Sequence, residues 1–269
     1  EVKKMETIEL VILSVIQGVT ELLPVSSSAH LILISKVWNT ELSTLMLTIL
    51  HLGTSLAIIV FLRKLLFTKI LSNEKLSLYL KIIVSSIPAG ITGILFENII
   101  EEKLRATWII AVSLIVWGIA MIVFEQKKNK TKDSKDISIE NITWKQSIIM
   151  GIAQAFALIP GTSRSGITTI AGMFSGLDKY TAFEYSFILG IPVLLGASIL
   201  EIGKTILNTD NLSIDTSLLS VTKMLPVILI SFVVGYLALI VVRKYKKKNW
   251  LTVFGIYRII VGILILIFI

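Results

Sequence analysis

Long hydrophobic segments recur from end to end of this chain, and they restrict its fold more than any other feature. Six are long enough to cross a hydrocarbon core of about 30 Å: residues 43–62, 78–96, 107–124, 183–203, 221–242 and 250–269. Only 16% of the residues are charged and 54% are hydrophobic, whereas soluble domains average about 25% charged residues. We therefore expect an all-α polytopic membrane protein with six transmembrane helices.

Two further apolar regions, 8–38 and 147–176, are each interrupted by a short polar stretch. The interruptions are Leu23-Pro24-Val25-Ser26-Ser27-Ser28 and the segment from Pro160 to Gly166. Proline disrupts a helix, and small hydroxyl side chains compete for its backbone hydrogen bonds. Non-helical backbone at membrane depth is tolerated only where it is buried in protein or faces water. We therefore predict two re-entrant helix-loop-helix pairs whose loops line a cavity.

The two interruptions also indicate an internal repeat. Aligning Pro24 with Pro160 places Ser26 on Thr162 and brings Gly53 close to Gly190. Each half would hold one re-entrant pair and three spans, an odd number of crossings, so the second half would insert upside down as an inverted-topology repeat. We expect a single membrane domain over 1–269, with half one at 5–124, a flexible cytoplasmic linker at 125–146 and half two at 147–269. The first apolar run has no cleavage site and is expected to belong to the fold rather than to a signal peptide.

The formal net charge of +8 comes from basic clusters at the ends of the spans. The loops after 62, 124, 178 and 242 share one predicted face and carry most of the lysines and arginines. The opposite face holds Lys3, Lys4, Lys103, Arg105 and Lys204, together with Glu97, Glu101 and Glu102. By the positive-inside rule the basic face is expected to be cytoplasmic, so membrane orientation explains the charge better than nucleic-acid binding does. The chain has no cysteine, so thiolate chemistry is excluded as well.

Ionisable groups at membrane depth cost about 2.5 to 3.5 kcal/mol for a central charge, so each is a candidate functional residue. Gln17 and Glu21 share one helix face at i and i+4, as an acid/base or metal-binding pair would. Ser27 and His30 combine a hydroxyl nucleophile with a proton-handling neighbour. Arg164 lies in a Gly- and Ser-rich loop before a helix, a typical phosphate cradle. The other candidate substrate contacts are Ser26, Ser28, Gln154, Thr162, Ser163, Ser165 and Gly166.

Structural alternatives stay open for these residues. Glu21 and Arg164 would also suit a buried ion pair that merely tethers the two halves. The three serines from Ser26 to Ser28 would also serve as helix caps. Three other polar positions lie in or at the start of predicted spans: His51, Glu184 and Arg258. They would fasten helices as readily as support a site, and they stay outside the candidate list.

The two polar stretches, Gln17 to His30 and Pro160 to Gly166, resemble the signature motifs of bacterial undecaprenyl-diphosphate phosphatases, and the resemblance covers the whole chain. The family's first motif has an acidic or amide residue, then Glu four positions later, then Ser and His, and its second motif contributes Arg. Many members have Glu at the position of Gln17. The resemblance therefore implies that Gln17 orients ligands while Glu21 carries the acid/base work.

The resemblance implies hydrolysis of undecaprenyl diphosphate to undecaprenyl phosphate and inorganic phosphate at the outer face of the plasma membrane. This reaction would recycle the lipid carrier for cell-wall synthesis and confer bacitracin resistance. Ser27 would attack phosphorus, Glu21 would act as base, His30 would assist proton transfer, and Arg164 would stabilise the phosphoryl oxygens. Either Ser27 or His30 would take the phosphoryl group. Mg or Ca carried by the substrate is the candidate cation, with Glu21 the one candidate ligand. No organic cofactor is expected, and a homodimer is compatible with the sequence.

Three rival functions have to be weighed. A polyprenyl-phosphate transporter or flippase fits because inverted repeats with broken helices are typical of transporters. The Ser27 and His30 pairing favours the enzyme, since transport of an anion does not require it. Membrane phosphatases related to soluble acid phosphatases need a late His with an Asp partner, whereas His30 and His51 are both early. A purely structural role does not explain two polar loops.

Overall fold

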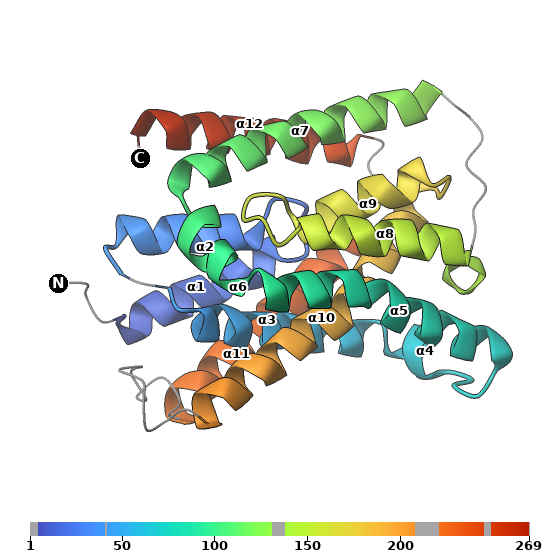
Figure 1. The fold of residues 1–269 in the computed structure, drawn as a ribbon, viewed down its shortest axis with the longest axis horizontal. Helices are drawn as coiled ribbons and strands as arrows, with labels where there is room; N and C mark the ends of the chain where they lie inside the picture. The colour runs from blue at the N-terminus through green and yellow to red at the C-terminus, as the bar shows by residue number, and fades with distance from the viewer. Residues whose placement is uncertain (1–4, 41, 131–137, 208–220, 245–248, 269) are drawn as a thin grey trace.

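The structure, a computed structural model, describes residues 5–40, 42–130, 138–207, 221–244 and 249–268, and their regular secondary structure is helical (Figure 1). The helices are α1 Thr7–Thr20, α2 Ser27–Val37, α3 Thr44–Phe61, α4 Arg63–Phe67, α5 Asn73–Leu95, α6 Glu97–Ile99, α7 Thr107–Lys130, α8 Trp144–Phe156, α9 Arg164–Phe174, α10 Lys179–Leu207, α11 Val221–Lys244 and α12 Trp250–Phe268. A π-helical turn, Ile100–Leu104, follows α6, and a 3₁₀ turn, Ile139–Asn141, precedes α8.

The six predicted spans are confirmed as helices long and apolar enough to cross a membrane: Thr44–Phe61, Asn73–Leu95, Thr107–Lys127, Lys179–Leu207, Lys223–Lys244 and Trp250–Phe268. The second span begins five residues earlier than its apolar pattern because Ser72 caps α5, where its hydroxyl accepts a hydrogen bond from the Lys75 backbone N–H. Polar residues can extend a capped helix beyond its apolar stretch. The chain is a multi-pass membrane protein.

Both interrupted regions form two short helices joined by a loop, as the proline and serine pattern predicted. The loops are residues 21–26 between α1 and α2 and residues 157–163 between α8 and α9. The residue before each second helix is a serine with positive φ, +73° at Ser26 and +69° at Ser163. In the second region this backbone conformation is at Ser163, one position beyond the Thr162 that the proline alignment paired with Ser26.

The helices pack in pairs that link the two halves of the sequence. Helices α7 and α12 lie side by side along one edge of the molecule, while α3 packs against α10 and α11 and α5 packs against α8 and α10 (Figure 1). A Cβ added to Gly118 would lie 2.7 Å from the Gly255 carbonyl oxygen, and one added to Gly255 would lie 2.6 Å from that of Gly118. Two glycines facing each other thus allow the close α7–α12 contact, as small residues commonly do between membrane helices.

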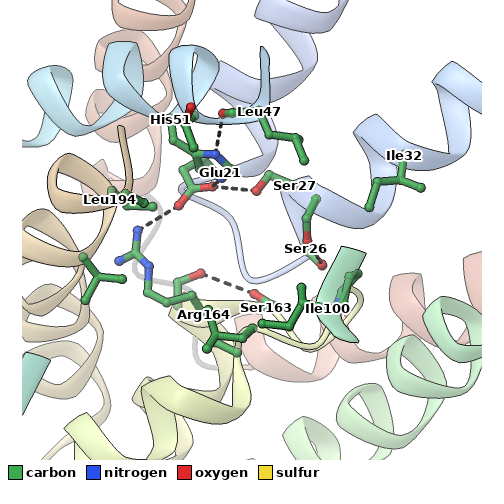
Figure 2. A pocket seen from close by; sticks show the side chains of 18 of the residues that line it. Glu21, Ser26, Ser27, Ile32, Leu47, His51, Ile100, Ser163, Arg164 and Leu194 are labelled. Atoms are coloured by element: carbon green, nitrogen blue, oxygen red, sulfur yellow. Dashed lines mark hydrogen bonds and ion pairs between the residues drawn. The ribbon is translucent and has the colours of Figure 1, made fainter. Parts of the chain in front are cut away.

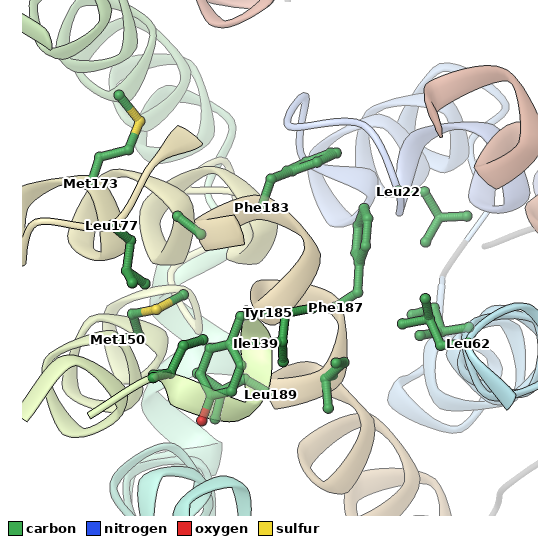
Figure 3. Close-up of a cluster of buried hydrophobic side chains, with 14 of the residues drawn as sticks. Leu22, Leu62, Ile139, Met150, Met173, Leu177, Phe183, Tyr185, Phe187 and Leu189 are labelled. Atoms are coloured by element: carbon green, nitrogen blue, oxygen red, sulfur yellow. The ribbon is translucent and has the colours of Figure 1, made fainter. Parts of the chain in front are cut away.

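A large buried apolar cluster holds α10 against α8 and α9 (Figure 3). Its centre includes Met150, Phe183, Tyr185 and Phe187. The Tyr185 hydroxyl is hydrogen-bonded to Ser147 Oγ at 2.6 Å. Ser147 Oγ in turn lies 2.7 Å from Ser85 Oγ on α5. A hydrogen-bonded polar group adds directionality to an otherwise apolar contact. This cluster anchors α9, whose first residue is Arg164.

The segment 125–146 differs from the flexible linker predicted for it, although residues 131–137 lie outside the described chain. Helix α7 continues to Lys130, and Glu125 is buried with its Oε1 2.6 Å from Lys179 Nζ. At the other end Ile139 and Ile142 join the apolar core. The polar composition of the segment predicted a linker, and composition does not reveal that two apolar residues and one ion pair within it are buried.

Candidate active site

The loops of the two interrupted regions meet and enclose a cavity of about 240 Å³ (Figure 2). Ser26 Oγ accepts a hydrogen bond from the Gly161 N–H at 3.1 Å, and Ser165 Oγ donates to the Leu23 carbonyl at 3.4 Å. Helices α3 and α10 supply further wall residues, among them His51 and Val193, and the connection between α5 and α7 adds Ile100 and Arg105. The structure brings eight of the predicted site residues to this one cavity: Glu21, Ser26, Ser27, Ser28, Gln154, Ser163, Arg164 and Ser165.

The Glu21 carboxylate lies at the centre of the polar network. Ser27 Oγ donates to Glu21 Oε2 at 2.5 Å, and Arg164 Nη2 donates to Glu21 Oε1 at 2.8 Å. Only 5% of the Glu21 side chain is exposed, so these charge-assisted contacts are shielded from water. Glu21 follows the last turn of α1 and Ser27 begins α2, so the intervening loop folds the carboxylate back onto the hydroxyl. A hydroxyl held on a carboxylate is a nucleophile with its base in place.

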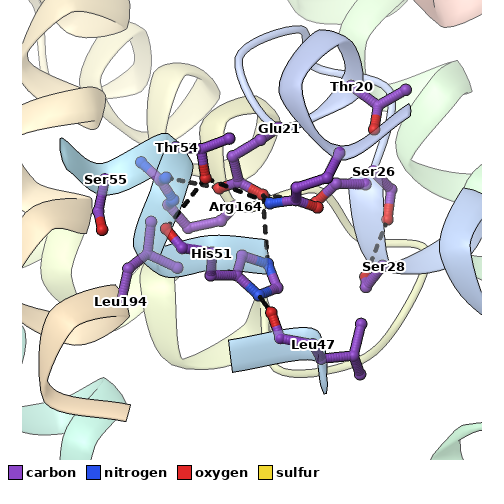
Figure 4. Close-up of polar contacts among 12 residues, drawn as sticks. Thr20, Glu21, Ser26, Ser28, Leu47, His51, Thr54, Ser55, Arg164 and Leu194 are labelled. Atoms are coloured by element: carbon purple, nitrogen blue, oxygen red, sulfur yellow. Dashed lines mark hydrogen bonds and ion pairs between the residues drawn. The ribbon is translucent and has the colours of Figure 1, made fainter. Parts of the chain in front are cut away.

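Gln17 and His51 also approach this carboxylate, and Figure 4 shows His51 beside Glu21. Gln17 Nε2 lies 3.3 Å from Glu21 Oε2 and 3.3 Å from Thr54 Oγ1. Gln17 does not line the cavity, so the structure places its amide on Glu21 and not among the substrate contacts predicted for it; an orienting role for Gln17 stays a prediction. His51 on α3 places Nε2 3.3 Å from Glu21 Oε2. Sequence reasoning noted the ionisable group at His51 but had no spacing signal to connect it with Glu21, because the two residues are separated by a loop and a helix.

Arg164 is held at the start of α9 with its guanidinium directed at Glu21. Its Nη1 donates to the Ser186 carbonyl at 2.8 Å, while Ser163 Oγ accepts from the Gly166 N–H at 3.3 Å and caps the helix. A Cβ on Gly190 would lie 2.1 Å from Nη1, so a glycine is needed there to admit the side chain. The predicted cap and the predicted ion pair are both present, and the helix N-terminus beside them offers N–H groups to an anion.

Unsatisfied hydrogen-bonding atoms also surround the cavity. Both amide atoms of Gln154 are buried without a partner among the described residues, and so is Arg164 Nε. Gln154 is 1% exposed and lines the cavity. Buried polar atoms normally have a partner, so these donors and this acceptor are suited to a ligand that brings its own polar atoms.

His30 does not reach the cavity, contrary to its predicted pairing with Ser27. Its Nδ1 lies 2.8 Å from the Ser26 carbonyl oxygen and its Nε2 lies 2.7 Å from the Tyr257 hydroxyl. The His30 and Tyr257 rings are stacked at 5.8 Å. Side chains three positions apart on a helix meet only when their rotamers point toward each other. Here the His30 ring points toward α12 instead. His30 supports the strained Ser26 backbone instead.

Two other predicted contacts lie behind the loops rather than in the cavity. Thr162 Oγ1 is 3.1 Å from Ser113 Oγ on α7. A Cβ on Gly166 would lie 2.2 Å from Met121 Cε, so this glycine serves close packing of α9 against α7. Two of the serines considered as helix caps do not cap α2 with their side chains. The Ser27 hydroxyl donates to Glu21, and Ser26 makes no side-chain hydrogen bond to the start of the helix.

Arg258 on α12 joins the two loops from behind and was left outside the predicted site. It is fully buried, and its Nη1 donates to the Pro24 carbonyl at 3.1 Å. Its Nη2 donates to the carbonyls of Gly161 and Thr162, the latter at 2.9 Å. The signal available in the sequence was the cost of an arginine inside an apolar span. Its partners are backbone atoms, which no side-chain motif reveals.

Comparison with known proteins shows the family of this chain. The family model described as bacitracin resistance protein BacA matches residues 10–264. "Undecaprenyl-diphosphatase 1" of Clostridioides difficile (strain 630) is 39% identical over 273 residues, covering 97% of this chain and 96% of that protein. "Undecaprenyl-diphosphatase" of Methanococcus aeolicus is 39% identical over 98% of this chain and 99% of its own, and that of Enterococcus faecalis is 35% identical over 95% of both. This chain therefore belongs to the BacA bacitracin resistance protein family.

Proposed function

We propose that this chain is a phosphatase that hydrolyses undecaprenyl diphosphate to undecaprenyl phosphate and inorganic phosphate. The observation that carries the proposal is the Ser27 hydroxyl held 2.5 Å from Glu21 Oε2, inside a cavity that also contains the Arg164 guanidinium. Relatives that share almost the whole chain are named for this activity. The product is the lipid carrier of cell-wall synthesis, and its recycling would confer the bacitracin resistance for which the family is named.

In the proposed mechanism Ser27 Oγ attacks the terminal phosphorus and gives its proton to Glu21 Oε2. The bond from that phosphorus to the bridging oxygen breaks, the lipid monophosphate leaves with the electron pair, and Ser27 holds the phosphoryl group. The leaving monophosphate takes the first proton from Glu21, so Glu21 can accept a second proton from the water that attacks the phosphorus. The bond from phosphorus to Ser27 Oγ then breaks, Oγ takes this second proton from Glu21, and inorganic phosphate is released. Arg164 and the α9 N-terminus stabilise the equatorial oxygens. The position of His30 favours Ser27 as the nucleophile.

The remaining cavity groups would bind the diphosphate. The Gln154 amide and Arg164 Nε offer free hydrogen-bonding atoms, and Ser28, Ser163 and Ser165 add hydroxyls to the same wall. Phosphate oxygens accept several hydrogen bonds at once, so these atoms suit the two phosphoryl groups of the substrate. Ser26 would act indirectly, since its hydroxyl joins the two loops.

A resident metal ion at Glu21 does not fit these residues. Both carboxylate oxygens already have partners, Arg164 on Oε1 and Ser27 on Oε2. No group of three or more His, Cys, Asp or Glu side chains in the described part of the chain could hold a metal ion. We propose that Mg or Ca, the candidate cations, arrive bound to the diphosphate.

The cavity would open toward the outer face of the plasma membrane. Its lining includes Ile100 and Arg105 from the connection between α5 and α7, and Thr44 from the start of α3. This end of the molecule carries Glu97, Glu101 and Glu102 beside its few basic residues. The opposite ends of α3, α7 and α11 have Arg63, Lys127 and Arg243 on or beside them, and the positive-inside rule assigns this side to the cytoplasm. A homodimer stays a prediction of the sequence.

An inverted repeat of 5–124 and 147–269 and two re-entrant loops are the arrangement we infer. Four residue pairs have the same sequence separation: Gln17 with Gln154, Ser26 with Ser163, Gly53 with Gly190 and Gly118 with Gly255. The packing has the matching symmetry, since α1 packs on α11 as α8 packs on α5, and α3 and α10 pack on each other. Such repeats are also typical of transporters, so lipid transport stays the alternative. The contact between Ser27 and Glu21 favours hydrolysis.

The prenyl tail would occupy a groove between α5 and α10. This groove has a volume of about 380 Å³ and shares Thr48, Leu158 and Val193 with the catalytic cavity. Gly90 and Gly196 line it, and a Cβ added to either would meet no atom within 4 Å. These glycines do not serve close packing, unlike Gly118, so they leave room for an apolar chain.

Filling the groove should weaken binding of the long lipid. We expect Gly196→Leu to raise the KM for undecaprenyl diphosphate about tenfold, because displacing roughly two buried methylenes costs about 1.6 kcal/mol. Gly203→Leu is the matched control, since Gly203 lies on the same helix in open space outside the groove. Steady-state kinetics in detergent measures both. An unchanged KM in Gly196→Leu would place the tail elsewhere.

The direct test of the proposed function is phosphate release by the purified protein in detergent. Undecaprenyl diphosphate should yield one inorganic phosphate per lipid, whereas undecaprenyl phosphate should yield none, because the leaving group would then be an alcohol. The assay is run with Mg, with Ca and with EDTA. No release from any lipid diphosphate under all three conditions would reject the phosphatase and leave the transporter.

A further inference from the structure

His51 is held between a backbone carbonyl and the catalytic carboxylate (Figure 4). Its Nδ1 lies 2.6 Å from the Leu47 carbonyl oxygen one turn earlier on α3, and its Nε2 lies 3.3 Å from Glu21 Oε2. The side chain is 18% exposed and lines the catalytic cavity. Both ring nitrogens are thus committed, so the imidazole has one orientation.

The carbonyl contact defines where the protons lie. A carbonyl oxygen only accepts hydrogen bonds, so Nδ1 carries a proton. A hydrogen bond between Nε2 and Oε2 then needs one more proton between the two atoms, and Oε2 can serve as the base for Ser27 only when that proton lies on Nε2. The contact fixes the direction in which Oε2 points.

That direction is the one in which the Ser27 hydroxyl lies. Ser27 Oγ is 2.5 Å from the same Oε2, and Gln17 Nε2 donates to this oxygen at 3.3 Å. Arg164 holds only Oε1, so the rotation of the carboxylate about its bond is set by the contacts of Gln17 and His51 with Oε2, and of these two side chains His51 lines the cavity. An activated nucleophile commonly has a base that is oriented in turn by a third group.

We propose that His51 is a positioning residue that acts through Glu21, holding Oε2 against the Ser27 hydroxyl. The proposal rests on the proposed phosphatase function. It assigns the histidine of the site to α3 rather than to the Ser27 motif, where His30 has turned away to Tyr257. His51 acts on the rate of the chemical step, because Glu21 would still bind Arg164 without it.

Two amide variants test the reach of this side chain. In His51→Gln the terminal amide nitrogen falls near the former Nε2 and can donate to Glu21. In His51→Asn the side chain is one methylene shorter, so its amide stops near the former Nδ1. We expect kcat for phosphate release from undecaprenyl diphosphate to fall about 100-fold in His51→Asn and less than about fivefold in His51→Gln, with KM changed little in both. Ser55→Ala removes a buried hydroxyl that donates to Leu52 on the same helix and is expected to match wild type.

Thermal melting of each variant checks folding, and Ser27→Ala and Glu21→Gln are measured beside them. Equal kcat in His51→Gln and His51→Asn, whether high or low, overturns the positioning role, and so does a change confined to KM. If Ser27→Ala and Glu21→Gln are also fully active, the proposed function itself has failed. If those two are inactive while both His51 variants turn over normally, only the role of His51 has failed.

Discussion

Glu21→Gln is expected to lower kcat for phosphate release by about 10² to 10⁴-fold, the usual contribution of a general base. The amide is nearly the same shape, but it cannot accept the proton that Ser27 loses as it attacks. Its nitrogen would also turn a hydrogen-bond donor toward either Ser27 or Arg164, which both donate now. Ser27→Ala should be at least as inactive. The measurement is initial-rate phosphate release at saturating undecaprenyl diphosphate.

The control for this prediction is a second buried, ion-paired glutamate far from the cavity. Glu125 is 1% exposed and its Oε1 lies 2.6 Å from Lys179 Nζ. If Glu21 only tethered the two halves through Arg164, Glu21→Gln and Glu125→Gln would lower the melting temperature to a similar degree, and both would keep their turnover once folded. The catalytic assignment requires that Glu125→Gln stays active while Glu21→Gln does not.

The membrane architecture was predictable because a single physical constraint dominates it. A span must be about 20 apolar residues long, so the six helices follow from hydropathy alone, and only their ends move where a polar cap such as Ser72 extends them. The loop breaks followed from Pro24 and Pro160 for a similarly local reason. The meeting of the two loops followed from the cost of burying polar groups.

The site itself was predictable only where its residues are local in sequence or have an obvious charge partner. Glu21 and Arg164 form the ion pair that was considered for them, because a buried charge in an apolar protein is stabilised by an opposite charge. The sequence pointed to His30 as the histidine of the site, because it is near Ser27 in the chain. The packing of α3 brings His51 to Glu21 instead. The sequence did not place Arg258 in the site for another reason. Its partners are main-chain carbonyls, which have no sequence signature.

Arg258 supplies the second large effect that we expect. The variant Arg258→Met should lower the melting temperature and reduce phosphate release about 100-fold or more in the protein that remains folded. It would leave the carbonyls of Pro24, Gly161 and Thr162 buried without their donors. Each unsatisfied buried group costs about 1 to 3 kcal/mol, and a displacement of about 1 Å between the loops would cost about 10²-fold in rate. Differential scanning fluorimetry and initial rates measure the two effects.

Arg258→Lys separates the charge from the geometry. An ammonium keeps the positive charge but is a single point, whereas the planar guanidinium reaches Pro24 on one loop and Gly161 and Thr162 on the other. Arg258→Lys should therefore fold better than Arg258→Met and still turn over slowly. Arg243→Met is the matched control, because Arg243 lies at the exposed end of α11 over the Phe61 ring. Wild-type turnover in Arg258→Lys would mean that charge alone holds the loops, since a lysine cannot bridge both.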